Sequence, residues 1–117
     1  MKDFTELEVW IKSRKLANII YSLSKGFPGS EIHGLTLQIR RAAISVPSNI
    51  AEGVGRNTKK DTLQFLYIAR GSLFELETQI YLAFDQNFIK DEHLKSSLEE
   101  VRHCKRLLNG FINYYQD

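Results

Sequence analysis

Apolar residues recur along most of the chain at intervals of three and four residues, the spacing of an amphipathic helix. The clearest series lies near the C-terminus, where Leu94, Leu98, Val101 and Leu108 share one helix face. The sequence has no alternating run of β-branched residues and no Asn-Gly turn that would indicate a hairpin. The pattern predicts an all-α protein with helices at about 6–25, 34–54, 59–86 and 91–115.

Turn-forming residues separate these predicted helices. The first helix ends at Gly26-Phe27-Pro28-Gly29, the second at Gly55-Arg56-Asn57, and the third in a short joint at 85–90. Because the last joint is short, the third and fourth helices should be antiparallel neighbours. A chain of 117 residues fits one domain, so we predict a single antiparallel, up-down-up-down four-helix bundle over residues 1–117.

Local sequence features refine the helix ends. Thr5 and Glu8 have the spacing of a capping box at the start of the first helix. Thr58 is placed to cap the third helix. Pro47 removes one amide from the middle of the second helix, so we expect a kink there, with a break into two shorter helices as the alternative.

The helix at 34–54 is apolar on two sides. One apolar row runs from Leu35 to Gly53, and a second contains Leu37, Ile44 and Ala51, each seven residues apart. An isolated bundle buries only one face of a helix, so the second row predicts contact with another subunit.

A row of polar residues accompanies the second apolar row on the same helix. These residues could hold a hydrogen-bond network between subunits, or they could form a plain solvated face. The predicted oligomer interface therefore comprises Leu37, Ile44, Ala51, Arg41, Ser45, Asn49 and Glu52.

The helix at 59–86 has a broad apolar arc. Tyr67, Phe74 and Tyr81 follow helical spacing, which favours a core position over a role in stacking on nucleic-acid bases. Arg70 and Glu77 fall inside the same arc, and we expect them to pair with each other or with the helix at 34–54.

The charge distribution limits the possible nucleic-acid contacts. A net charge of +2 is too small for a strongly basic nucleic-acid binder, so any such function requires a local patch. Between Gly34 and Lys60 the bases outnumber the single acid, Glu52. The alternative is that each basic cluster is a solvated helix face. The candidate phosphate contacts are Lys12, Arg14, Lys15, Arg40, Arg41, Arg56, Lys59 and Lys60.

Nothing in the sequence indicates catalysis, a metal or a cofactor. His33, His93 and His103 do not have the spacing of paired metal ligands on one helix face. Cys104 lacks an evident base beside it. The segment 53–60 lacks the Gly-Lys-Ser/Thr end of a nucleotide-binding loop. We therefore expect a protein that is not an enzyme.

The chain also lacks the features of exported or membrane proteins. Its first residues include charges where a signal peptide needs an apolar run, and no apolar stretch approaches the roughly 20 residues of a membrane span. One cysteine excludes an internal disulfide. We expect a cytoplasmic protein that does not contact membranes.

One long segment is distinctive. The run Ser-Val-Pro-Ser-Asn-Ile-Ala-Glu-Gly at 45–53 follows Leu-Gln-Ile-Arg-Arg-Ala-Ala-Ile at 37–44, with Trp10, Phe27-Pro28 and Gly-Ser-Leu-Phe-Glu-Leu-Glu at 71–77 as further matches. In these motifs, over essentially its whole length, the chain resembles the 23S rRNA-intervening-sequence proteins, also called four helix bundle proteins.

The resemblance implies an antiparallel bundle assembled as a ring-shaped homopentamer. The chain is also similar to the accessory variability protein of diversity-generating retroelements, a pentamer whose basic surface engages reverse transcriptase and nucleic acid. The family implies no established enzymatic activity. We therefore predict a non-enzymatic oligomeric scaffold that contacts structured RNA or a nucleic-acid-bound protein, with a protein-interaction hub lacking any nucleic-acid role as the alternative.

Overall fold

The computed structural model describes residues 3–116, and the long elements in this range are all α-helices. Short 3₁₀ turns at Phe4–Glu6 and Gly29–Glu31 precede the first and second of them. Every helix boundary lies within two residues of its predicted position. The four helices are α1 (Glu8–Ser24), α2 (Leu35–Val54), α3 (Lys59–Asp85) and α4 (Asp91–Gln116).

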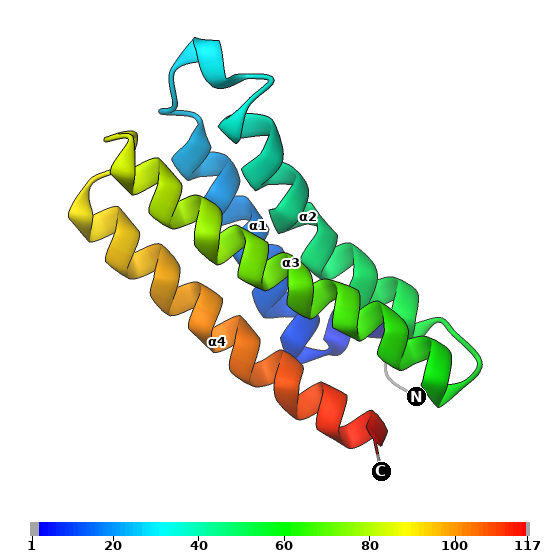
Figure 1. Ribbon diagram of the computed structural model, residues 1–117. Helices are drawn as coiled ribbons and strands as arrows, with labels where there is room; N and C mark the ends of the chain where they lie inside the picture. The colour runs from blue at the N-terminus through cyan, green and yellow to red at the C-terminus, as the bar shows by residue number, and fades with distance from the viewer. Residues whose placement is uncertain (1–2, 117) are drawn as a thin grey trace.

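Each helix packs against the next one, and α4 packs back against α1 (Figure 1). Side-chain contacts show that successive helices run in opposite directions. Ser24 at the end of α1 bonds Arg40 near the start of α2, while Gly53 at the end of α2 bonds Thr62 at the start of α3. Within residues 3–116 the diagonal pairs α1/α3 and α2/α4 make no close backbone approach. This arrangement confirms the predicted all-helical, antiparallel architecture.

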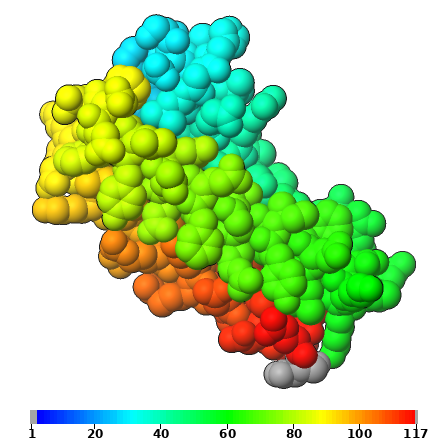
Figure 2. Space-filling view, in the orientation of Figure 1, coloured from blue at the N-terminus to red at the C-terminus, as the bar shows by residue number. Residues whose placement is uncertain are grey.

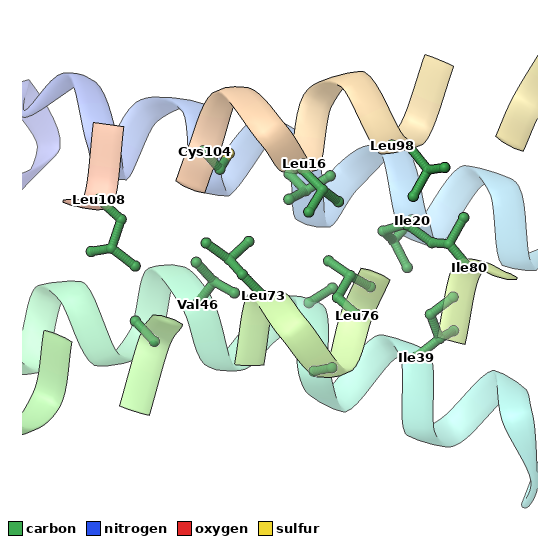
Figure 3. Packing of buried hydrophobic residues seen from close by; sticks show 14 of the residues in the cluster. Leu16, Ile20, Ile39, Val46, Leu73, Leu76, Ile80, Leu98, Cys104 and Leu108 are labelled. Atoms are coloured by element: carbon green, nitrogen blue, oxygen red, sulfur yellow. The ribbon is translucent and has the colours of Figure 1, made fainter. Parts of the chain in front are cut away.

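The interior is filled by aliphatic side chains from all four helices, which point toward a common axis (Figure 3). Their burial supplies most of the free energy that holds the helices together, because helices of this length gain little from intrinsic propensity alone. Among the fully buried side chains are Leu16, Ile20, Ile39, Ile50, Leu73, Leu76, Ile80 and Leu108.

The packing between α2 and α3 is tight and depends on small residues. A Cβ atom added at Gly53 would lie 3.1 Å from the Cβ of Phe65 and 3.1 Å from the carbonyl oxygen of Thr62. The Thr62 hydroxyl donates to the Gly53 carbonyl oxygen over 2.8 Å. Farther along, the hydroxyls of Ser45 and Ser72 are 2.7 Å apart. The glycine at the end of the 45–53 motif is therefore required by the close approach of the two backbones.

Two joints are fixed by specific backbone contacts. The Glu31 carboxylate accepts from the Leu35 amide over 2.9 Å and so caps α2. At the end of α3, Asn87 has a φ of 63°. This left-handed residue allows the Phe88 amide to donate to the Ala83 carbonyl oxygen over 2.9 Å.

Two of the predictions about local structure at the ends and middle of helices are wrong, and one is confirmed. Thr5 does not cap α1, because it lies in the preceding 3₁₀ turn and the helix begins after Leu7, an extended residue with no side-chain cap. The alternative of a break at Pro47 is wrong, since α2 continues through that residue. Thr58 does cap α3, accepting from the Asp61 amide over 3.2 Å.

The expected partners of Arg70 and Glu77 are also wrong. Neither side chain pairs with the other or with α2. The Glu77 carboxylate forms an ion pair with Lys105 of α4, and Arg70 donates to the Asn109 side chain over 3.4 Å. The reason is geometric, because both residues lie on the side of α3 that turns toward α4.

Candidate functional site

The first candidate surface is the outer side of α2 and α3, here called the α2–α3 face. Ile44 is 44% exposed, and Ile68 and Leu82 of α3 are 51% and 46% exposed. Leu37 and Ala51, the other members of the predicted second row of α2, are half-buried. Folding of one chain therefore leaves apolar side chains of both helices in contact with water.

The polar residues predicted for this interface divide into two groups. Ser45 and Asn49 are bonded within the subunit: the Asn49 amide donates to the Ser45 carbonyl and hydroxyl oxygens, and Ser45 reaches Ser72 of α3. Arg41 and Glu52 are exposed, and Glu52 forms a 3.7 Å ion pair with Arg56. The structure thus places all seven predicted interface residues along α2, with part of the polar row already engaged internally.

The predicted basic residues on α1 are separate from those on α2. Arg14 is exposed, with its guanidinium 5.6 Å from the centre of the Trp10 ring. Lys15 is exposed and lies 3.8 Å from the Glu100 carboxylate. Lys12 is half-buried on the same helix. These three cations lie on α1, and Lys15 is partly neutralised by Glu100 of α4.

Arg40 has a structural position. Its Nε donates to the Ser24 hydroxyl over 2.7 Å, and its guanidinium lies 4.7 Å from the centre of the Tyr21 ring. These contacts tie the end of α1 to the start of α2. The neighbouring Arg41 points elsewhere and is exposed. Of this adjacent pair, Arg41 is the one whose guanidinium is accessible to a ligand.

The joint between α2 and α3 gathers Arg56, Lys59 and Lys60, all of which are exposed. The Arg56 guanidinium lies over the Phe65 ring at 4.6 Å. The joint stands at the opposite end of the bundle from the start of α2 (Figure 1). Since sixteen residues of helix span about 24 Å, Arg40 and Arg56 cannot contribute to one compact site. The predicted phosphate contacts therefore form separate clusters.

The structure also reveals a surface that the apolar spacing did not predict. Tyr67, Phe74 and Tyr81 are 39%, 55% and 44% exposed, so the expected core position of these three rings is wrong. They follow the outer edge of α3 beside α4, here called the α3–α4 face. Arg70 and Glu77 in the same row were the evidence that could have revealed it, because charged side chains seldom occupy a core.

Cations of both helices and an amide of α4 contact Tyr67 and Phe74. Lys105 lies 4.1 Å from the centre of the Phe74 ring while it pairs with Glu77. The Arg70 guanidinium lies 5.1 Å from the Tyr67 ring centre. The Gln116 amide donates to the Tyr67 hydroxyl over 3.0 Å. α3 runs across the middle of the surface shown in Figure 2, with α4 beside it.

The cysteine that was considered for catalysis lies in the interior. Cys104 is buried between α1 and α4, where loss of solvation, together with the Glu100 carboxylate, raises the pKa of its thiol to about 11. At neutral pH this thiol is protonated and a poor nucleophile. In residues 3–116 there is no cluster of three or more histidine, cysteine or acidic side chains that could hold a metal ion. None of the described helices is long and apolar enough to span a membrane.

The comparisons with known proteins agree with this architecture. Residues 5–110 match the model of the family described as 23S rRNA-intervening sequence protein. A crystal structure of a protein of unknown function from the S23 ribosomal protein family of Bacteroides thetaiotaomicron superposes with a TM-score of 0.82 and 26% sequence identity, covering 89% of this chain and 97% of that one. No curated protein matches the chain. The family match extends over nearly all of the bundle, and the chain therefore belongs to the 23S rRNA-intervening sequence protein family.

Proposed function

We propose that this protein is a non-enzymatic scaffold that assembles with copies of itself through the α2–α3 face and contacts RNA or an RNA-bound protein. The observation that carries the proposal is the set of exposed aliphatic side chains on that face, Ile44, Ile68 and Leu82. On α2 the exposed Ile44 belongs to the apolar row that it forms with Leu37 and Ala51, and an apolar row that folding of one chain leaves partly in water fits a contact with another subunit. A homopentamer is the assembly that the family resemblance implies.

A buried polar atom on the same side of α3 supports a subunit contact. The side-chain oxygen of Gln79 is buried and has no hydrogen-bond partner among residues 3–116. Gln79 lies seven residues after Ser72, so both side chains lie on the side of α3 that faces α2. Native proteins satisfy most buried polar groups, and a rotation of the half-buried Gln79 side chain toward a donor of a second subunit would satisfy this one.

The RNA part of the proposal draws support from the exposed cations. Arg41 on α2 and the cluster of Arg56, Lys59 and Lys60 at the joint are accessible to phosphate groups. One chain presents too few of them for tight binding. Repetition in an oligomer multiplies weak phosphate contacts into useful avidity, which connects the two parts of the proposal.

The assembly is tested by light scattering at micromolar concentration. We expect the wild-type protein to be a multimer, and Ile44→Glu or Leu37→Glu to be a single subunit with nearly unchanged helicity by circular dichroism. A charge placed in an apolar contact is strongly unfavourable, whereas at a wet surface it is tolerated. Ile11→Glu is the matched control, because Ile11 is exposed to a similar extent, 46%, on α1. A wild-type monomer, or an Ile44→Glu multimer, would contradict the proposal.

The RNA contact is tested separately by titrating structured RNA across a salt series. We expect binding that weakens as salt increases, because phosphate contacts release counterions. Arg41→Gln and Lys60→Gln should weaken it further. If the protein does not bind RNA at low salt, and a protein partner is recovered after nuclease treatment, the molecule is instead a protein-interaction hub.

A further inference from the structure

We propose that the α3–α4 face is a platform for single-stranded RNA, on which unpaired bases stack against exposed rings and phosphates contact nearby cations. This inference rests on the proposed RNA contact and assigns it to a surface and to an unpaired strand. It adds to the cations of α2 and its joint, which lie on other parts of the molecule.

The rings form a regular row. Tyr67, Phe74 and Tyr81 are separated by seven residues each, or about 10 Å along α3, and each exposes more than a third of its surface. Aromatic side chains are among the residues that folding buries most readily, so three exposed rings in line are unusual for a surface facing only water. A row of exposed rings fits ligands that are themselves flat and aromatic.

The charges beside the row favour an anionic ligand. Lys105 contacts Phe74, and Arg106 is exposed at the next position of α4. Arg70 and Arg106 have no carboxylate partner among the described residues, and Glu77 is already neutralised by Lys105. Arg102, one turn earlier on α4, forms an ion pair with Glu99 over 3.7 Å. The positive charge that remains unpaired, on Arg70 and Arg106, thus lies on the α4 side of the rings.

Neutral amides complete the surface. The Asn109 side-chain oxygen is 3.4 Å from Arg70, and the Gln116 amide nitrogen is 3.0 Å from the Tyr67 hydroxyl. Amide groups at this position can exchange these weak, exposed contacts for hydrogen bonds to base edges. Aromatic rings with cations and amides, and few aliphatic residues between them, are the composition of single-strand binding surfaces.

The same composition argues against a duplex as the ligand. In an RNA duplex the bases are stacked on one another, so their faces are not available to protein rings. A duplex would use the cations and leave the rings in water. The platform therefore predicts a preference for unpaired RNA that depends on the aromatic residues.

The test is fluorescence anisotropy with labelled oligouridine, a ligand with no stable secondary structure. We expect Phe74→Ala together with Tyr81→Ala to weaken binding roughly tenfold or more, because stacking contributes substantially for each base. Tyr81→Phe keeps the ring and should retain wild-type affinity. Tyr114→Ala is the matched control, since its side chain is 71% exposed but lies outside the row.

The outcomes separate this platform from the broader RNA proposal. Ultraviolet crosslinking of oligouridine to the peptide that contains Phe74 supports the platform. Equal binding of duplex and single strand overturns it. Wild-type affinity in the Phe74→Ala, Tyr81→Ala variant also overturns it. If Lys60→Gln binds weakly in the same experiment, the general RNA contact is still supported. Dissociation of the multimer by the double ring variant identifies the face as a subunit contact and also overturns it. If the protein binds neither single-stranded nor duplex RNA at low salt, both proposals are wrong.

Discussion

Helix α3 packs against α2 and against α4 in contrasting ways. Against α2 it uses small side chains, with Gly53 close to the α3 backbone and paired serine hydroxyls farther along. Against α4 it uses long ones, with Lys105 reaching across to Glu77 and Gln116 reaching to Tyr67. The first packing brings the two backbones close and fixes their separation. The second keeps large rings at the rim, where they are available to another molecule.

The largest loss of stability is expected from a substitution at Gly53. Gly53→Val should destabilise the folded state by about 3 kcal/mol, because the new side chain meets backbone and Cβ atoms of α3 and the helices must separate. The measurement is urea unfolding. Gly71→Ala on α3 is the control: nothing lies within 4 Å of the added atom, so higher helix propensity should stabilise the protein by about 1 kcal/mol. Similar losses in both variants would show that the α2–α3 packing is looser than described.

The packing between α3 and α4 depends instead on a charge pair. Lys105→Gln should cost about 2 kcal/mol, because it leaves the Glu77 carboxylate, whose side chain is only 24% exposed, without its partner. Adding Glu77→Gln should recover part of this loss in a double-mutant cycle. Lys95→Gln is the control, since Lys95 is 76% exposed in its pair with Asp91 and its loss should leave the stability essentially unchanged. A coupling energy of zero in the cycle would show that the ion pair does not stabilise the folded state.

The smallest effect is expected from a single hydroxyl between α2 and α3. Thr62→Val removes the hydrogen bond to the Gly53 carbonyl oxygen with little change in shape. The free energy of unfolding should fall by only about 1 kcal/mol, because the backbone amide of Arg56 still donates to that oxygen. Thr78→Val is the control, since the exposed Thr78 hydroxyl bonds only a carbonyl of its own helix. Equal thermal unfolding midpoints for the two variants would contradict this assignment.

The sequence was sufficient to predict the helices and most of their ends. The apolar spacing of α4 and the breaks at Pro28 and Gly55 are local features, and each defines an element without knowledge of its neighbours. The capping box failed because Leu7 interrupts the helix start, and such an extended residue leaves no pattern in the sequence.

The candidate surfaces were harder to predict. On α3 the apolar arc is broad, and which part faces inward depends on where α2 and α4 pack. Tyr67 and Phe74 therefore have core-like spacing but lie at the rim. The partner of Glu77 is Lys105, twenty-eight residues away, a distance at which spacing carries no information. The exposure of Ile44 on α2 was predictable, because its apolar row repeats within one helix.

The left-handed turn at Asn87 limits how this part of the chain can evolve. Glycine adopts such a backbone freely, and asparagine and aspartate tolerate it, whereas a β-branched residue does not. Because the Phe88 amide must reach the Ala83 carbonyl to reverse the chain, a valine or isoleucine here would shift where α4 begins. Natural variation at this position should favour those three residue types and avoid β-branched ones, even where the surrounding surface diverges completely.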